Sequence, residues 1–260
     1  MLLVMDTSTQ YASVALSHQD TLLASVTWLV ENRHSAELLL RVNEVLSAAR
    51  VAPGRLEAIG VALGPGSFNG VRAGVATAKG LSLALSAPIV GVPTLDIIGW
   101  GARLAPEEVW SLLDAGRGEV YAAAYDTAGA APSTWAPRAF DAGDGHGLAS
   151  YHILTPAALA ACARDGATLA GEARIATRAM IEAELGGRAN TSTLAEPRSG
   201  AWLAALAQAR LDAGRPDTPE SLEPLYLRRP AITHSERPDI TALSNGAQPA
   251  DGAKGERLAL

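Results

Sequence analysis

Two polar turns hold the side chains in this sequence that could do chemistry. The first, Asp6-Thr7-Ser8-Thr9, follows the apolar run 2–5 and offers one carboxylate and three hydroxyls, which could contact a phosphate or water-bound magnesium. The second, Gly64-Pro65-Gly66-Ser67, follows an apolar run ending at residue 63 and precedes a helical pattern. Free amides and the positive end of a helix dipole converge at such a turn, so it could cradle an anion. The candidate cradle residues are Asp6, Thr7, Ser8, Gly64, Gly66 and Ser67.

The glycine turn nevertheless departs from two standard phosphate-binding motifs. The dinucleotide fingerprint requires a glycine three residues after Gly66, where Asn69 stands. A P-loop requires a lysine directly after Gly70, where Val71 stands. We therefore expect weak or absent nucleotide binding and no bound cofactor. In the alternative interpretation, the side chains of the turn at Asp6 bond to their own backbone and the turn is structural.

The remaining reactive side chains do not form a recognisable catalytic or metal-binding set. The five histidines are scattered, with no pair at metal-ligand spacing, so we expect no metal site. The single cysteine, Cys162, lies in an alanine-rich helical pattern and is typical of an inert core residue. A second polar cluster, Asp114, Arg117 and Glu119, could be functional, but hairpin turns are commonly charged.

The pattern of apolar residues predicts a mixed sheet covered by helices. We expect strands over 2–5, 11–16 and 21–30, a helix over 35–49, a strand ending at 63, a helix over 70–85, a strand over 88–92 and a helix over 94–104. Strands joined through helices pair in parallel, whereas the opening meander is antiparallel. Residues 110–125 repeat the opening pattern of strand, aspartate, small turn and strand, which indicates an internal duplication. Further helices are expected over 156–164, 174–185 and 201–213, a loop over 136–150 and a short strand over 225–227.

The helix over 70–85 carries two rows of small residues at four-residue spacing. Gly66, Gly70, Gly74, Ala78 and Ser82 form one row, and Ala76, Gly80 and Ala84 form the other. Small residues at this spacing let another backbone approach closely. From spacing alone, that backbone belongs equally well to the chain's own sheet or to a partner helix.

Composition excludes several classes of protein. Of 260 residues, 18% are charged and 48% are hydrophobic, which is typical of a globular chain. The net charge of −6 argues against a broad nucleic-acid footprint. The longest uncharged stretch, 80–95, is interrupted by prolines and is too short to span a bilayer, and one cysteine fits a cytoplasmic location. From residue 235 the chain lacks apolar periodicity, so we expect a disordered tail over 235–260.

Residues 64–81, Gly-Pro-Gly-Ser-Phe-Asn-Gly-Val-Arg-Ala-Gly-Val-Ala-Thr-Ala-Lys-Gly-Leu, resemble the TsaB (YeaZ) family of tRNA threonylcarbamoyladenosine biosynthesis. Segments 4–9, 31–39, 114–121 and 223–228 extend the resemblance over about residues 1–230. It implies an α/β, actin-like or sugar-kinase-like fold of two related domains, 1–104 and 105–234. It also implies a non-catalytic paralogue of TsaD, because Thr94 and Ile98 stand where TsaD-type chains carry two metal-binding histidines.

The same resemblance implies the partners. A TsaD-type catalytic subunit is expected to pack on the helices over 35–49 and 70–85, with a TsaE-type ATPase joining the assembly and tRNA contacted only within it. A homodimer through the same helices is the arrangement expected without TsaD. The expected interface residues are Leu39, Leu40, Gly70, Arg72, Gly74, Ala78 and Lys79. An ATP-dependent enzyme using Asp6 and Asp114 is the alternative, and a metalloprotease is a remote third.

Overall fold

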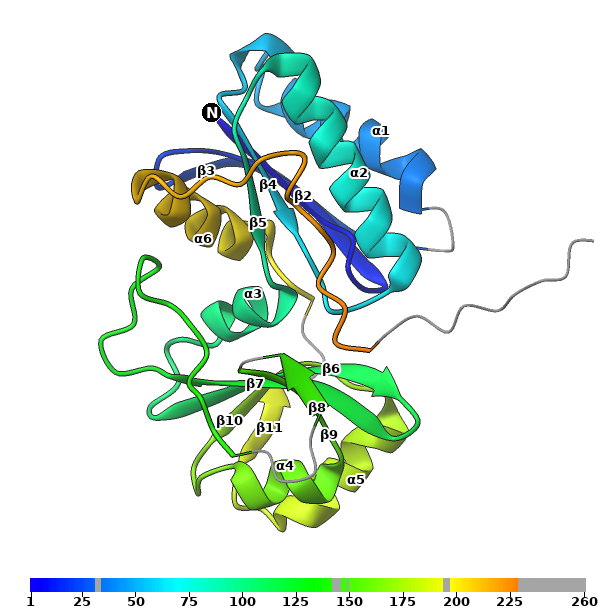
Figure 1. Ribbon diagram of the computed structural model, residues 1–260, viewed down its shortest axis with the longest axis vertical. Coiled ribbons are helices and arrows are strands. Elements are labelled where there is room, and N and C mark those ends of the chain that lie inside the picture. Colours follow the sequence, from blue (N-terminus) through cyan, green and yellow to red (C-terminus); the bar gives the residue numbers. More distant parts are fainter. Residues whose placement is uncertain (31–33, 142–145, 149, 194–196, 229–260) are drawn as a thin grey trace, which may run out of the picture. The chain divides into compact units, whose positions relative to one another are not determined.

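The apolar runs of the first half form a five-stranded mixed sheet. In this computed structural model, which describes residues 1–30, 34–141, 146–148, 150–193 and 197–228, the strand order is β3-β2-β1-β4-β5 (Figure 1). The strands are β1 (Leu2–Asp6), β2 (Tyr11–His18), β3 (Thr21–Leu29), β4 (Ala58–Ala62) and β5 (Ile89–Val92). The meander β1–β3 is antiparallel, whereas β4 and β5, reached through α1 (His34–Ala48) and α2 (Phe68–Leu85), are parallel to β1, as expected. A short 3₁₀ helix, Pro53–Arg55, lies between α1 and β4.

The second sheet repeats the topology of the first. Its strands are β6 (Glu108–Gly116), β7 (Glu119–Asp126), β8 (His146–Leu148), β9 (Tyr151–Leu154), β10 (Thr168–Glu172) and β11 (Asn190–Thr193). Apart from β8, their order β9-β7-β6-β10-β11 and their directions match β3-β2-β1-β4-β5 strand for strand. This match confirms the duplicated α/β fold. Strands β9, β10 and β11 were not predicted from the apolar pattern, and the prediction of a loop over 136–150 is wrong where β8 forms.

Each half sends its last helix onto the other half's sheet. Helices α1 and α2 cover one face of the first sheet, and α4 (Pro156–Cys162) and α5 (Ile175–Leu185) cover one face of the second. The opposite face of the first sheet packs on α6 (Gly200–Asp212), where Leu203 and Ala207 join a core with Val4. The opposite face of the second packs on α3 (Thr94–Gly101), where Leu95 joins a core with Val109. A division into domains 1–104 and 105–234 remains a prediction.

The small-residue row of α2 packs against the chain's own sheet. Gly70, Gly74, Ala78 and Ser82 are all buried, and a Cβ at Gly74 would lie 2.5 Å from Thr7 Oγ1. The expectation that a partner approaches along Gly70, Gly74 and Ala78 is therefore wrong for this fold. The other row is exposed: Ala76, Gly80 and Ala84 face away from the sheet, and a Cβ at Gly80 would meet nothing within 4 Å.

The segment after α6, orange in Figure 1, runs along the first half and reaches the second. Asp217 N donates to Ile89 O of β5 (2.8 Å), Leu225 N donates to Leu63 O (2.7 Å), and Arg228 Nη1 donates to Ala115 O (2.9 Å). The expected strand over 225–227 does not form, because these residues pair with no neighbouring strand. The expected tail, 235–260, lies outside the described residues.

Within the described residues, no helix is both long enough and apolar enough to cross a membrane.

Candidate functional site

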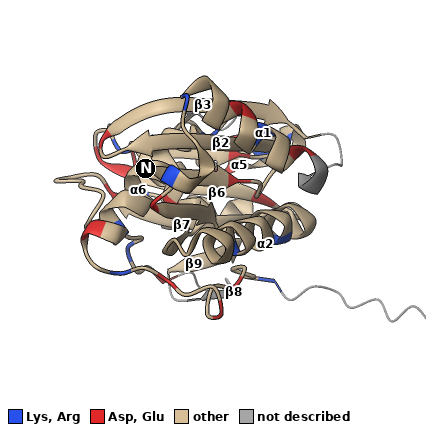
Figure 2. Cartoon of the chain, turned by 90° about the horizontal axis from the view of Figure 1, so that it is seen from above, with Lys and Arg blue, Asp and Glu red and all other residues tan. Residues whose placement is uncertain are grey.

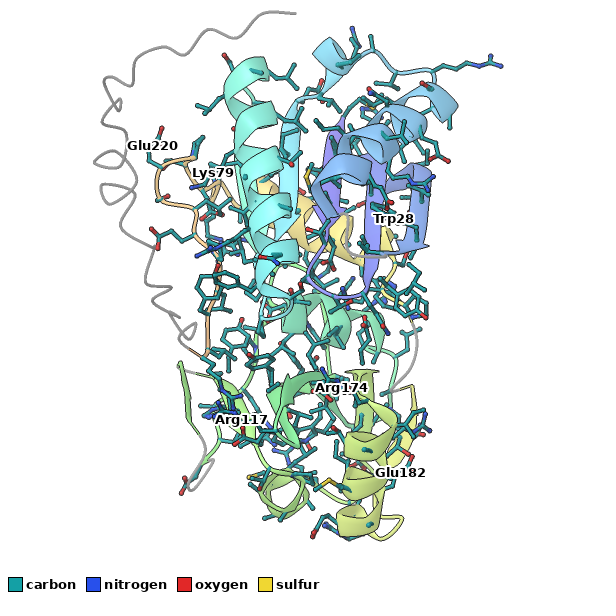
Figure 3. All side chains as sticks on the ribbon, turned by 90° about the vertical axis from the view of Figure 1, so that its right-hand side faces the viewer. Trp28, Lys79, Arg117, Arg174, Glu182 and Glu220 are labelled. Atoms are coloured by element: carbon teal, nitrogen blue, oxygen red, sulfur yellow. The ribbon has the colours of Figure 1, made fainter. Side chains whose placement is uncertain are left out.

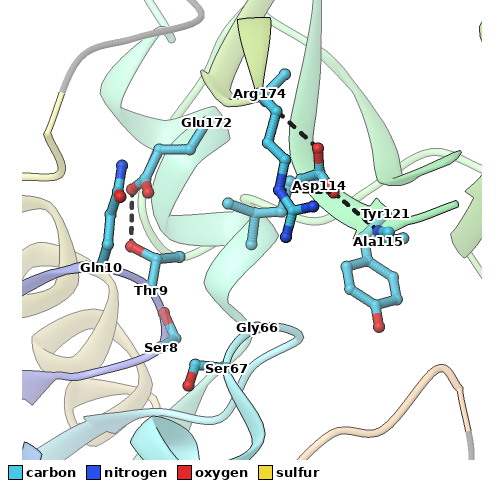
Figure 4. Close-up of a pocket in the computed structure, with 13 residues that line it drawn as sticks. Ser8, Thr9, Gln10, Gly66, Ser67, Asp114, Ala115, Tyr121, Glu172 and Arg174 are labelled. Atoms are coloured by element: carbon cyan, nitrogen blue, oxygen red, sulfur yellow. Dashed lines mark hydrogen bonds and ion pairs between the residues drawn. The ribbon is translucent and has the colours of Figure 1, made fainter. Parts of the chain in front are cut away.

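A cleft of about 460 Å³ lies at the carboxyl ends of β1, β6 and β10, where ligands of open α/β sheets bind (Figure 4). The two polar turns that the sequence analysis selected meet here, because Ser67 N donates to Ser8 O (2.6 Å). The residues that line it are Ser8, Thr9, Gln10, Gly66, Ser67, Leu113, Asp114, Ala115, Gly116, Tyr121, Glu172, Ala173 and Arg174. Of the six predicted cradle residues, Ser8, Gly66 and Ser67 line the cleft, whereas Asp6, Thr7 and Gly64 do not.

Several polar groups of the two turns bond to neighbouring backbone of the same chain. Thr7 Oγ1 donates to Gly70 O (2.7 Å), and Ser67 Oγ caps α2 by accepting from Gly70 N (3.3 Å). Gly64 O accepts from Thr94 N (2.7 Å), and Gly64 has a φ of +90°, which favours glycine. A side chain at Gly66 would overlap the Ser8 carbonyl. These bonds join the end of β1 to the start of α2.

The carboxylate of Asp6 is fully engaged. Its Oδ1 accepts from Ser8 N (2.8 Å) and Ser8 Oγ (2.6 Å), and its Oδ2 accepts from Arg198 Nε (2.7 Å). Arg198 is 3% exposed and enters from the second half of the chain, just before α6. Its Nη1 pairs with Glu172, and its Nη2 donates to Thr9 Oγ1 (3.0 Å). A cation at Asp6 would have to displace this guanidinium.

Burial shifts the pKa values of the groups around this guanidinium. Burial raises the pKa of Glu172, and the neighbouring Arg198 only partly opposes that change. Burial also lowers the pKa of Arg198, but the charges of Asp6 and Glu172 more than compensate and raise it. Arg198 therefore remains a fixed positive charge between two carboxylates.

No sequence pattern predicts Arg198 as a residue of this site. Arg198 and Asp6 are separated by 192 positions, and no motif surrounds the arginine. Only the duplicated topology brings the segment before α6 to the end of β1.

The second polar cluster does not form as a unit. Asp114 lines the cleft and holds the start of α5, because its Oδ2 accepts from Thr177 Oγ1 (2.9 Å) and Arg174 N (3.3 Å). Glu119 pairs instead with Arg228. Arg117 lies in the β6–β7 turn with a φ of +59° and does not line the cleft.

The positions compared with the TsaD-type histidines are inaccessible. Thr94 is 0% and Ile98 is 3% exposed, both on α3. Among the described residues there is no group of three or more His, Cys, Asp or Glu side chains that could hold a metal ion.

The helices α1 and α2 present apolar side chains to solvent. Leu39 is 50% exposed, Leu40 63% and Leu83 64%. Figure 3 shows the two helices side by side, with Lys79 on α2 labelled. Arg72 is exposed but held in place, since its Nε donates to Tyr226 OH (2.9 Å) and its guanidinium lies 3.7 Å from the centre of the Phe68 ring.

Sequence comparison relates the chain to one group of proteins. A family profile described as TsaD, tRNA N6-adenosine threonylcarbamoyltransferase, matches residues 27–177. The tRNA threonylcarbamoyladenosine biosynthesis protein TsaB of Bacillus subtilis (strain 168) is 36% identical over 124 residues, which are 48% of this chain and 54% of that protein. The protein of the same name from Escherichia coli (strain K12) is 36% identical over 126 residues, again 48% and 54%. The match therefore spans about half the length of these curated relatives.

Structural comparison covers nearly the whole of two solved chains. YeaZ from Pseudomonas aeruginosa superposes with a TM-score of 0.68 at 28% identity, over 86% of this chain and 98% of that one. A second structure, of an uncharacterized protein with similarity to peptidase YEAZ from Pseudomonas aeruginosa, also gives 0.68, at 30% identity over 87% and 99%.

Proposed function

We propose, because the chain belongs to the TsaB (YeaZ) family of tRNA threonylcarbamoyladenosine biosynthesis, that it is a non-catalytic subunit that binds a TsaD-type catalytic subunit. A TsaE-type ATPase joins this assembly, which modifies adenosine 37 of ANN-decoding tRNAs in the cytoplasm. The tRNA is contacted only within the assembly.

The exposed face of α1 and α2 is the observation that carries the proposal. Leu39 and Leu40 on α1 and Leu83 on α2 leave apolar surface in water, which soluble chains usually cover with a partner. The exposed row Ala76, Gly80 and Ala84 lets a partner helix approach the α2 backbone closely. Lys79, at an intermediate exposure on the same helix, supplies charge beside this face.

The buried arginine supports a subunit without its own phosphate chemistry. A carboxylate that holds water-bound magnesium must reach the cleft, whereas Asp6 is 2% exposed and bonded to Ser8 and Arg198. In the turns that would cradle a phosphate, Ser67 N donates to Ser8 O and Thr7 Oγ1 donates to Gly70 O.

An ATP-dependent enzyme remains the second candidate because of the cleft itself. Its volume of about 460 Å³ and its position at the strand ends suit a nucleotide-sized ligand, and Asp114 lines it. Asp114 would then be the carboxylate that such an enzyme uses, since Asp6 is occupied. A metalloprotease has no comparable support, because neither Thr94 nor Ile98 supplies an imidazole to a metal.

Co-purification with a TsaD-type subunit tests the proposal. Gly80→Leu adds a side chain to the exposed face of α2, where overpacking a helix contact costs about 1–3 kcal/mol, or roughly five- to a hundredfold in affinity. Leu83→Glu should weaken binding by a similar factor. Leu104→Glu, at a residue 86% exposed outside the two helices, is the matched control and should bind normally.

Two outcomes would contradict it. Normal binding by both α2 variants would show that the partner does not use this face. ATP hydrolysis by the isolated chain, lost in Asp114→Asn, would favour the enzyme instead.

A homodimer through the same helices would lose its contact in the same two variants, Gly80→Leu and Leu83→Glu.

A further inference from the structure

Two aromatic side chains hold Arg72 of α2 in one orientation. The guanidinium carbon lies 3.7 Å from the centre of the Phe68 ring, and Nε donates to Tyr226 OH (2.9 Å). The two rings also contact each other, with their centres 5.5 Å apart. Phe68 is the first residue of α2, and Tyr226 follows Leu225, whose N–H is bonded to Leu63 O (2.7 Å). Both supports of the guanidinium therefore lie on anchored backbone.

The remaining donors of Arg72 have no acceptor within the described part of the chain. An arginine has five N–H donors in a planar fork, and stacking on a ring engages the face of the guanidinium rather than these donors. The bond to Tyr226 uses Nε–H, and no described residue accepts from Nη1 or Nη2 or forms an ion pair with Arg72. The exposed side chain thus presents two nitrogens, in a set direction, for which these residues supply no partner.

Helix α2 is positively charged in a negatively charged chain. Its only charged residues are Arg72 and Lys79, so it has no red segment in Figure 2, whereas the whole chain has a net charge of −6. The first turn of α2 holds no acidic residue, so nothing in the helix neutralises the positive end of its dipole. A negatively charged group is therefore the complement of this end of α2.

Arg72 also lies in line with the exposed face of α2. Ala76, Gly80 and Ala84 follow it at four-residue steps, and residues at this spacing are neighbours on one side of a helix. Leu83, which is 64% exposed, lies about three turns farther along on the same side. A partner helix that packs along the small row would therefore reach Arg72 at the end of the row.

We propose that Arg72 receives an acidic side chain, an aspartate or a glutamate, of the partner subunit that packs on α2; this inference rests on the proposed function. The two Nη nitrogens match the two oxygens of a carboxylate, and such bidentate pairs are strong and directional. Because Phe68 and Tyr226 hold the guanidinium before the partner arrives, little side-chain entropy is lost on binding. The small row then sets how closely the partner helix approaches, and Arg72 sets its position along the row.

A carboxylate fits this place better than a phosphate of RNA. Nucleic-acid surfaces gather several basic residues into a patch, whereas α2 offers Arg72 and, about two turns farther along, Lys79. The net charge of −6 also opposes the approach of a polyanion. A single carboxylate beside a mostly apolar contact is what one arginine can neutralise.

Titration of the full chain with a purified TsaD-type subunit, in the absence of RNA, tests the proposal. Arg72→Gln should weaken binding about tenfold or more, because hydrogen bonds between charged groups contribute at least that much. Arg72→Lys should weaken it nearly as much, since lysine keeps the charge but loses the planar fork. Arg215→Gln is the matched control. It removes the same charge at an exposed residue beyond α6, which covers the opposite face of the first sheet, and should bind normally.

Tyr226→Phe tests the positioning of the guanidinium. It removes the acceptor of Nε–H and should weaken binding by about two- to fivefold. In the Arg72→Gln background the same change should have no further effect, because no guanidinium is left to hold. Equal effects in the two backgrounds would show that Tyr226 acts independently of Arg72 and would overturn the positioning.

The pH dependence separates a carboxylate from a phosphate. The wild type should lose its advantage over Arg72→Gln as the pH is lowered from about 7 to about 4, because a carboxyl group becomes neutral near its ordinary pKa. A phosphodiester stays ionised over this range. An advantage that does not change with pH would therefore overturn the carboxylate.

Failure of this inference and failure of the proposed function give different results. If Gly80→Leu weakens binding but Arg72→Gln does not, the partner uses α2 without a carboxylate at Arg72, and only this inference is wrong. If the wild type does not bind a TsaD-type subunit, both are wrong.

Discussion

Asp6 and Asp114 occupy equivalent places in the two halves of the chain, yet their surroundings differ. Each ends or nearly ends the central strand of its sheet, before an antiparallel neighbour. Asp6 is 2% exposed and paired with Arg198, whereas Asp114 lines the cleft and bonds to the first turn of α5. The duplicated topology therefore fixes where a carboxylate stands, but distant side chains decide whether it can meet a ligand.

The largest effect should come from removing the arginine that closes the first of these sites. Arg198→Ala leaves Asp6 and Glu172 without their counter-charge in a buried position, and breaking a buried pair in this way costs about 3–5 kcal/mol. The free energy of unfolding in urea measures it. Arg174→Ala is the equivalent change at Asp114, and since Arg174 is 79% exposed and 3.8 Å from that carboxylate, the loss should stay below about 1 kcal/mol. Equal losses of stability in Arg198→Ala and Arg174→Ala would mean that the two arginines hold Asp6 and Asp114 equally firmly.

A smaller effect is expected where α2 supports the Asp6 turn. Gly74→Ala places a Cβ 2.5 Å from Thr7 Oγ1 and should destabilise the chain by about 1–3 kcal/mol. Gly80→Ala, farther along the helix on the exposed row, meets open space and should stabilise it by up to about 1 kcal/mol. Thermal unfolding of the two variants and the wild type measures both changes in stability. If both variants were stabilised, or both destabilised, the assignment of Gly74 to the buried row and Gly80 to the exposed row would be refuted.

Loss of the carboxylate at Asp114 should lower the free energy of unfolding by a still smaller amount. Asp114→Ala removes the acceptor for Thr177 Oγ1 and Arg174 N at the start of α5, and a lost helix cap costs about 0.5–2 kcal/mol. Amide hydrogen exchange should become faster in the first turn of α5 while β1 is unchanged. Faster exchange at β1 instead would show that the two halves are coupled through Asp114.

The smallest effect should be a pH dependence from the second carboxylate on Arg198. Because burial raises the folded-state pKa of Glu172 above 4.5, the folded chain holds this proton more tightly than the unfolded chain does. The stability due to Glu172 is therefore present below pH 4.5 and is lost as the pH rises through the raised pKa. Urea midpoints measured from about pH 4 to about pH 7 should show this loss in the wild type and not in Glu172→Gln. If the urea midpoints of the wild type and of Glu172→Gln changed with pH in parallel, a contribution of Glu172 to the pH dependence would be excluded.

Local patterns predicted much of the first half. The starts of β1, β2 and β3 agree with the alternation of apolar residues, and α2 begins only two residues before its predicted start because Ser67, not a later residue, caps it. The strand β10 was missed because Thr168–Glu172 is short and lacks a distinctive pattern. The face of α2 that meets the sheet was not predictable, since both small rows have the same spacing and only tertiary packing separates them.

The candidate site could be predicted only in part, because local patterns show where strands end but not which distant side chains meet there. Both polar turns follow apolar strands and were selected as candidate sites separately; the structure shows that they meet, because Ser67 N donates to Ser8 O. Their bonding partners depend on contacts between distant segments. Arg198 is the clearest case, because nothing near position 198 predicts a bond to position 6.

The exchange of α3 and α6 between the halves sets the order in which the chain can fold during its synthesis. When residues 1–104 have left the ribosome, α1 and α2 can cover one face of the first sheet, but the face that includes Leu2, Val4 and Val90 waits for Leu203 and Leu206 of α6. Until about residue 212 is available, that face stays open to water or to a chaperone. The first sheet is thus begun before α1 is made and is completed only after α6 is made.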